Sequence, residues 1–107
     1  MTTGRMTFGR VIAEARKKLG LSQKDLAAQV EKEDRRTISA QYLNDIEHDR
    51  RNPPSDFILE QLATILKINK DYLYYLAGQL PSDLRSDPSE QKKVEAAFKA
   101  FRRTLKE

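Results

Sequence analysis

The chain has 107 residues, which suffice for one domain but not for two independent hydrophobic cores. Lysine and arginine number 20 against 16 acidic residues, so the formal net charge of +4 favours a polyanionic partner without requiring one. The chain has no cysteine, which excludes disulfides and thiolate metal sites and leads us to expect a cytoplasmic protein. No apolar run approaches the roughly 20 residues that span a bilayer, and no signal-peptide core is visible, so we expect no membrane partner.

Apolar residues recur at helical spacing along nearly the whole chain, and no segment is a strong candidate for a strand. The first predicted helix is typical, with Phe8, Ile12, Ala15 and Leu19 on one face. Helix starts are indicated by side-chain oxygens that can accept an unpaired backbone N–H of the first turn, and helix ends by glycine. The predicted starts are Thr7, Ser22, Ser39, Ser55, Asn69 and Ser89, and the predicted ends include Gly20 and Gly78. We therefore expect an all-α fold with five helices and a further C-terminal helix.

Three segments interrupt the helical pattern. Residues 31–37, EKEDRRT, are polar throughout, and residues 48–54 contain two adjacent prolines, which a helix interior does not tolerate. Residues 79–88 contain two further prolines and are predicted to form a linker. The chain is thus expected to divide into a domain at 7–78, a linker at 79–88 and a C-terminal helix at 89–107. The apolar face of this last helix consists of Val94, Ala97, Phe98, Phe101 and Leu105.

Two consecutive predicted helices carry a recognisable motif. Residues 21–30 read LSQKDLAAQV, and residues 39–53 read SAQYLNDIEHDRRNP. In this order they resemble the XRE (lambda-repressor-like) helix-turn-helix family, whose pattern is LSQ-x-x-LA, a capped helix ending in IE, and a loop ending in RNP. The resemblance covers residues 8–78 and includes LEQLATIL and the closing YLAG. It implies a five-helix lambda-repressor-like bundle and a transcriptional regulator that binds double-stranded DNA by sequence, with no enzymatic activity and no cofactor.

The resemblance also assigns roles in DNA binding to individual residues. The second helix of the motif lies in the major groove, where its N-terminal residues reach base edges. The matching residues here are Ala40, Gln41, Asn44 and Asp45. Gln41 is the strongest candidate because a side-chain amide can donate and accept together against adenine, whereas Asp45 could accept from cytosine or repel phosphate. Phosphate contacts, which fix the register without reading sequence, are expected from Ser22, Gln23, Tyr42, Arg50, Arg51 and Asn52.

The chain departs from the family between the two motif helices. The family turn usually spans one glycine, whereas residues 31–37 add six residues here. A longer second helix or a solvated loop is the simpler explanation, because the cost of closing a loop grows slowly with its length. The alternative is that Arg35 and Arg36 make an additional phosphate contact. Ile38 still supplies the apolar residue before the next helix cap, so the motif assignment is unaffected.

Several polar and aromatic residues have structural explanations. Arg16 and Glu47 match family positions that form a partly buried ion pair between the first helix and the recognition helix. The three tyrosines within residues 72–75 lie at helical spacing and are expected in the core or an interface. His48 is the only histidine, and the chain lacks cysteine and any glycine-rich phosphate loop, so neither a metal site nor catalysis is expected.

The C-terminal helix is too apolar on one face for a free tail, so something must cover that face. One alternative is that the helix packs back on its own domain. The favoured alternative is a homodimer interface, because regulators of this kind bind two half-sites as two-fold dimers.

The sequence is compatible with three functions. A repressor is favoured over an activator because a separate ligand-sensing domain does not fit in 107 residues. The second is an antitoxin, in which the C-terminal segment would bind a toxin. The third follows from the LPSDLR segment at residues 80–85, since similar regulators are paired with a metallopeptidase that removes their C-terminal part.

Overall fold

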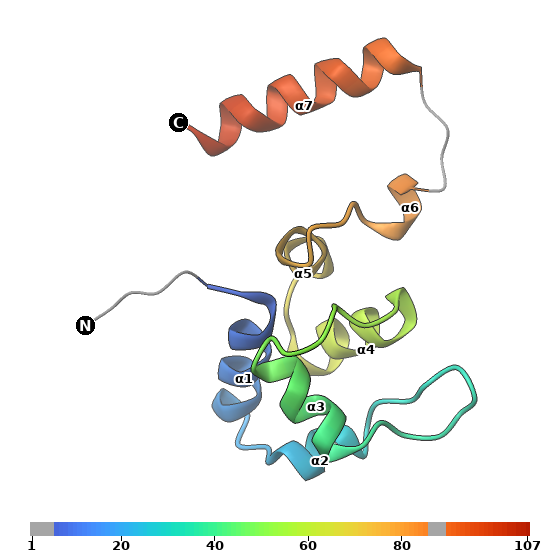
Figure 1. The fold of residues 1–107 in the computed structure, drawn as a ribbon. Coiled ribbons are helices and arrows are strands. Elements are labelled where there is room, and N and C mark those ends of the chain that lie inside the picture. Colours follow the sequence, from blue (N-terminus) through green and yellow to red (C-terminus); the bar gives the residue numbers. More distant parts are fainter. Residues whose placement is uncertain (1–5, 86–89) are drawn as a thin grey trace.

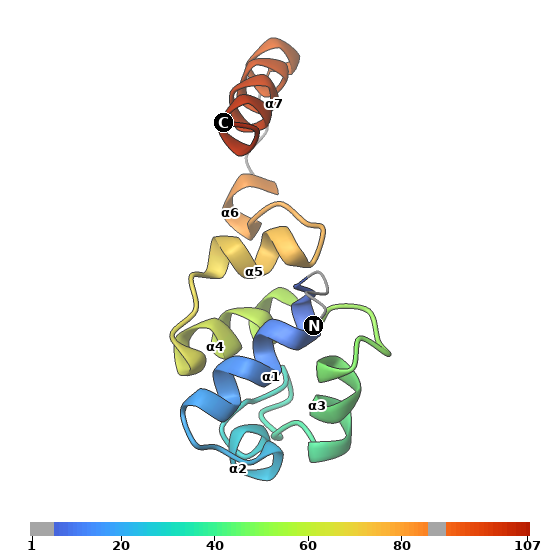
Figure 2. The ribbon, with the colours of Figure 1, turned by 90° about the vertical axis from the view of Figure 1, so that its left-hand side faces the viewer.

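The computed structural model describes residues 6–85 and 90–107, and the elements formed within these ranges are helices (Figure 1). They are α1 (Phe8–Lys18), α2 (Gln23–Ala27), α3 (Ala40–Glu47), α4 (Asp56–Leu66), α5 (Lys70–Leu76), α6 (Ser82–Arg85) and α7 (Gln91–Leu105). Helices α1 to α5 form a bundle, and α7 lies beyond α5 at the end opposite α2 (Figure 2). The predicted all-α fold, a five-helix bundle followed by a C-terminal helix, is confirmed.

Helices α1 to α5 begin where side-chain oxygens accept a first-turn backbone N–H. Ser22 and Asp25 form a reciprocal capping box in which each side chain bonds the other's backbone N–H, at 2.9 and 3.0 Å. The other side-chain caps in the described residues are Thr7, Ser39, Ser55 and Asn69. The last predicted start, Ser89, lies outside the described residues, and α7 begins after Glu90 without a side-chain cap.

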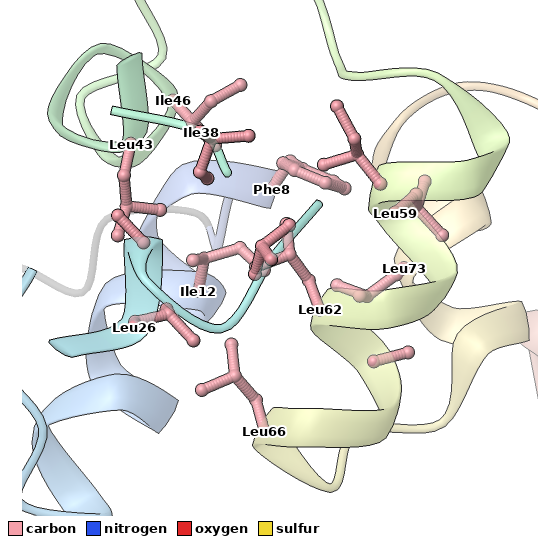
Figure 3. Close-up of a cluster of buried hydrophobic side chains, with 14 of the residues drawn as sticks. Phe8, Ile12, Leu26, Ile38, Leu43, Ile46, Leu59, Leu62, Leu66 and Leu73 are labelled. Atoms are coloured by element: carbon pink, nitrogen blue, oxygen red, sulfur yellow. The ribbon is translucent and has the colours of Figure 1, made fainter. Parts of the chain in front are cut away.

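The hydrophobic core lies between α1, α3, α4 and the helices that flank them. Figure 3 shows Phe8 and Ile12 of α1 lying between side chains of α3 and α4. Burying a side chain of this size stabilises the fold by about 1.5–3 kcal/mol as an upper estimate. Several members are completely buried, namely Ile12, Leu26, Leu43, Leu59, Leu62, Leu73 and Tyr74. Every element of the bundle therefore contributes to one core, which fixes the orientation of α3.

The inserted segment between α2 and α3 is a short exposed hairpin. Glu31 and Thr37 form an isolated antiparallel bridge, and Lys32 N donates to Arg36 O at 2.7 Å. The Gln61 side chain of α4 holds the base of the hairpin, because it donates to the carbonyl of Glu31 and accepts from its N–H at 2.7 and 2.8 Å. Helix α2 ends at Ala27, so the alternative of a longer second helix is wrong. All seven side chains of residues 31–37 are exposed, as expected for a solvated loop.

The segment predicted as a linker, 79–88, contains the one-turn helix α6. Ser82 donates to Glu60 Oε2 at 3.0 Å, and the Arg85 guanidinium pairs with Asp56. Both acceptors lie on α4, four residues apart on one face, so α6 is tied to the bundle by polar contacts. Apolar periodicity does not reveal polar contacts of this kind, which is why the sequence indicated a linker. Residues 86–88 of that segment lie outside the described residues.

Candidate nucleic-acid interface

A buried ion pair joins α1 to α3 beneath the helix-turn-helix motif. Arg16 Nε lies 2.6 Å from Glu47 Oε2, and a second bond joins the guanidinium to Oε1 at 3.0 Å. The third contact of Arg16 is the carbonyl of Leu21, at 2.8 Å. The hydrogen bonds to Glu47 raise the pKa of Arg16, which keeps this side chain charged despite its burial. The pair therefore couples the start of the motif to the end of α3.

Gln23 extends this network to the first turn of α2. Its Nε2 donates to Glu47 Oε1 at 2.9 Å and to Asn44 Oδ1 at 3.0 Å. One amide group thus bridges the two motif helices and holds the side chain of Asn44 by its oxygen. Gln23 was expected at a phosphate and Asn44 at a base, and in this structure the two bind each other. Asn44 keeps the two donors of its Nδ2 for a base, whereas Gln23 uses both of its Nε2 donors, so a phosphate contact by its side chain requires one of these bonds to break.

A second clamp, not anticipated from the sequence, joins α1 to the loop after α3. Asp49 has a positive φ of 56°, and its carboxylate accepts from Gly9 N at 2.9 Å and from Thr7 Oγ1 at 2.5 Å. A Cβ on Gly9 would lie 2.4 Å from the carbonyl oxygen of Ile46 and 2.6 Å from that of Glu47. The backbones of α1 and α3 therefore lie so close together at Gly9 that only glycine fits there. The available sequence signal was a glycine inside an otherwise regular helical pattern.

On its exposed side, α3 carries a cluster of polar side chains around Asp45. Gln41 Nε2 donates to Asp45 Oδ1 at 3.0 Å. The guanidinium groups of Arg50 and Arg51 each lie 3.7 Å from an Asp45 carboxylate oxygen. The structure thus brings four of the predicted DNA-contacting residues together. Asp45 occupies the centre of the cluster, where it contacts the other three side chains.

Tyr42 continues this surface toward the inserted hairpin. The Arg51 guanidinium lies over its ring, 4.8 Å from the ring centre, a cation–π contact. Burial raises the pKa of Tyr42, the charge of Glu33 on the hairpin raises it further, and Arg51 opposes both. Tyr42 therefore stays a neutral hydroxyl, able to donate a hydrogen bond to a phosphate at neutral pH.

The remaining predicted site residues surround this cluster. Ala40 is half-buried in the first turn of α3, and Asn52 is exposed in the loop after it. The Ser22 hydroxyl oxygen accepts from Asp25 N in the capping box of α2. This bond fixes the position of the hydroxyl but does not use its O–H as a donor. His48 lies at the end of α3, where Nδ1 is 2.9 Å from the carbonyl oxygen of Asn44. Within residues 6–85 and 90–107, no three His, Asp or Glu side chains are grouped to hold a metal ion.

Helices α2 and α3 are thus joined by buried polar contacts on one side, and amide and guanidinium groups lie on the exposed side. A family model described as a helix-turn-helix domain matches residues 9–79. The chain belongs to the XRE family of helix-turn-helix proteins. This XRE-family protein is accordingly a DNA-binding transcriptional regulator.

A search of solved structures places this XRE-family regulator beside one chain of a SinR protein/SinI protein complex. The two chains share 26% sequence identity and superimpose with a TM-score of 0.53. The similarity covers 94% of this chain and 92% of that chain, so it extends beyond the helix-turn-helix domain to the C-terminal helices. No curated protein matches the chain. None of the described helices is sufficiently long and apolar to traverse a membrane.

Proposed function

We propose that the protein is a sequence-specific repressor that binds double-stranded DNA with α3 in the major groove. The observation that carries this proposal is the division of α3 into two sides. The inner side, with Leu43, Ile46 and Glu47, is buried against the bundle, whereas the outer side presents Gln41 and Asp45. An exposed helix with a rigid base and an amide in its first turn fits the requirements for reading base edges.

The arrangement supports separate roles for the two kinds of side chain. Gln41 reads a base, Asn44 reads a second base one turn later, and Ala40 contacts a thymine methyl group. Asp45 acts chiefly by positioning Gln41, Arg50 and Arg51, since it already binds all three. Phosphate contacts, which add affinity without specificity, come from Ser22, Gln23, Tyr42, Arg50, Arg51 and Asn52.

The protein acts as a homodimer in this proposal. Two-fold dimers of this fold place their recognition helices in half-sites about 34 Å apart along the DNA. The large exposed apolar side chains after residue 70 support an interface there, because a solvated surface of that kind is unfavourable.

A second candidate function is inhibition or control through a partner protein bound at the C-terminal segment. The similar solved chain comes from a complex of two different proteins, and its similarity extends into this segment. A toxin or another regulator is the class of partner that this alternative requires. Cleavage by a metallopeptidase is less favoured, because α6 is tied to α4 through Ser82 and Arg85.

The test is selection of bound DNA from a random library, followed by titration of single-base variants of the selected operator. Gln41→Ala is expected to lose about 1–3 kcal/mol of specific binding and to relax preference at one position in each half-site. Gln29→Ala removes an exposed glutamine just after α2 and serves as the matched control with unchanged preference. A wild-type preference profile in Gln41→Ala would show that α3 does not read bases through this residue.

Arg51→Ala separates phosphate contacts from base contacts in the same assay. It is expected to weaken binding equally on all sequences and to reduce the slope of log affinity against log salt by about 0.9. An unchanged slope would exclude Arg51 from phosphate binding.

A further inference from the structure

The C-terminal helix exposes a continuous apolar face. Val94, Phe98, Phe101 and Leu105 are between 41% and 57% exposed, and none of the residues of α7 is buried. Phe101 meets the ring of Tyr75 edge-on, with ring centres 6.3 Å apart, yet 47% of Phe101 stays accessible. Figures 1 and 2 show that α7 is otherwise separate from the bundle. Contact with its own domain therefore leaves about half of this face uncovered.

The spacing of these four residues is that of a helix that packs along another helix. Their separations of four, three and four residues place them at alternating core positions of a seven-residue repeat. Five of the six basic residues of 91–107 lie away from this stripe: Lys92, Lys93, Lys99, Arg103 and Lys106. The stripe can therefore be buried while these charges stay in water.

Charges beside the stripe indicate which occupant and which direction fit. Glu95 and Arg102 are seven residues apart and flank the stripe on the same side. In an antiparallel pair of identical helices, equivalent flanking positions face each other, so Glu95 of one copy faces Arg102 of the other. In a parallel pair, Arg102 instead faces Ala97 of the other copy and Glu95 lies beside the start of the other helix, next to the acidic cap residue Glu90, so no ion pair forms. The charge pattern is thus complementary to a second copy in one direction only.

We propose that α7 pairs with α7 of a second copy in an antiparallel two-fold arrangement. Phe98 then packs against the partner's Phe101, and Val94 packs against the partner's Leu105. Two Glu95–Arg102 ion pairs border this core, one on each half of the interface. Glu95 now bonds Gln91 of its own helix at 2.7 Å, a contact that the new ion pair would share or replace. The inference rests on the homodimer of the proposed function and specifies its interface and direction.

Disulfide trapping tests the direction, because the natural chain contains no cysteine. In full-length Val94→Cys or Leu105→Cys protein, the new cysteine of an antiparallel pair lies far from its equivalent. Under mild oxidation neither variant alone should form a covalent dimer, whereas an equimolar mixture of the two should. Lys99→Cys places the cysteine on the outer face and is the control that should not crosslink.

Each other outcome contradicts the inference. Crosslinking of each variant with itself would indicate a parallel pair. No crosslinking in the mixture, with wild-type protein dimeric in sedimentation, would show that the dimer forms through another surface. Monomeric wild-type protein would contradict both this interface and the proposed homodimer, while leaving the DNA-reading role of α3 to its own test.

A charge exchange provides a second readout that does not depend on cysteine. Arg102→Glu places two acidic groups opposite each other twice per dimer and should weaken dimerisation roughly threefold to tenfold. The double variant Glu95→Lys/Arg102→Glu should restore it, because both pairs are re-formed with reversed sign. Lys99→Glu makes the same change in net charge on the outer face and should have little effect. Failure of the double variant to recover would show that Glu95 and Arg102 do not meet across an interface.

Discussion

The bundle and α7 have the same kind of amphipathic sequence and opposite degrees of burial. In the bundle, the apolar stripes of α1, α3 and α4 meet one another, and Ile12, Leu43 and Leu59 are completely buried. In α7 an equally regular stripe is about half exposed. Periodicity reports that a helix has an apolar face, but it does not report what covers that face. The bundle provides its own cover, whereas α7 requires a contact from outside its own domain.

The same contrast separates the polar groups of the two regions. Below the motif, Arg16 and Glu47 are buried and bonded to each other, Gln23 joins α2 to α3, and Asp49 joins α1 to the loop after α3. The charged groups of α7 lie in solvent. Substitutions at buried polar contacts of the bundle should therefore change folding stability, whereas substitutions on α7 should change association.

The largest effect is expected from breaking the buried ion pair. Arg16→Ala or Glu47→Ala leaves the other charge buried without its partner, which costs about 3–5 kcal/mol of folding stability. The double variant should lose less than the sum of the two, because no charge is then stranded. Urea unfolding of the three proteins measures this coupling. Glu14→Ala, in an exposed pair whose atoms lie 4.0 Å apart, is the control and should change stability by less than about 0.5 kcal/mol.

Strict additivity of the Arg16 and Glu47 losses would contradict the pair as a coupled unit.

A smaller change in folding stability, opposite in sign to the usual effect of replacing a helical glycine by alanine, is expected where α1 and α3 approach each other. Replacing glycine by alanine inside a helix usually stabilises it by up to about 1 kcal/mol. Gly9→Ala should instead destabilise the protein by about 1–3 kcal/mol, because the new Cβ meets two backbone carbonyl oxygens, which cannot rotate away. Thermal unfolding gives the sign directly. A stabilised Gly9→Ala protein would show that the two helices can separate at little cost.

Much of this fold could be predicted from the sequence. Side-chain caps such as Ser22 and Asn69 and the stripe of α4 depend on local chemistry, so their positions followed from residue type and spacing. Asp49 and α6 were missed because their contacts join residues far apart in the chain, Gly9 in one case and Asp56 in the other. The sequence did not predict that the insertion forms a hairpin, because the hairpin is held by a distant side chain, Gln61 of α4.

For the DNA-contacting residues, the sequence supplied positions but not mutual contacts. Spacing placed Gln41 and Asp45 on α3, yet only the three-dimensional arrangement shows that Asp45 binds Gln41 and both loop arginines. The roles of these residues at bases and phosphates stay predictions.

The smallest effect concerns the contact by which α5 holds α4. Tyr74 donates to Glu60 Oε2 at 2.6 Å; burial and this bond raise the pKa of Tyr74 to about 12, and the bond lowers the pKa of Glu60. The tyrosine's contribution to stability is complete below its unfolded pKa of about 10 and is lost as pH rises through about 12. That of Glu60 is present above its unfolded pKa and is lost as pH falls through the lower folded pKa.

Tyr74→Phe should therefore cost about 1 kcal/mol at neutral pH and make stability less dependent on pH at both extremes. Chemical unfolding across the pH range measures both changes. A variant with the wild-type pH profile would show that the Tyr74–Glu60 bond does not contribute.

The most direct test compares full-length protein with a truncation lacking residues 89–107, each titrated with single and with paired half-sites. It asks whether the bundle reads DNA and whether α7 joins two bundles. Both proteins should bind a single half-site equally well, because the bundle and α3 are intact in each. On two half-sites spaced by one helical turn, the full-length protein should bind roughly 100-fold more tightly, through the effective concentration of the second domain. Equal affinity of the two proteins for the paired site would contradict the account, as would loss of half-site binding in the truncated protein.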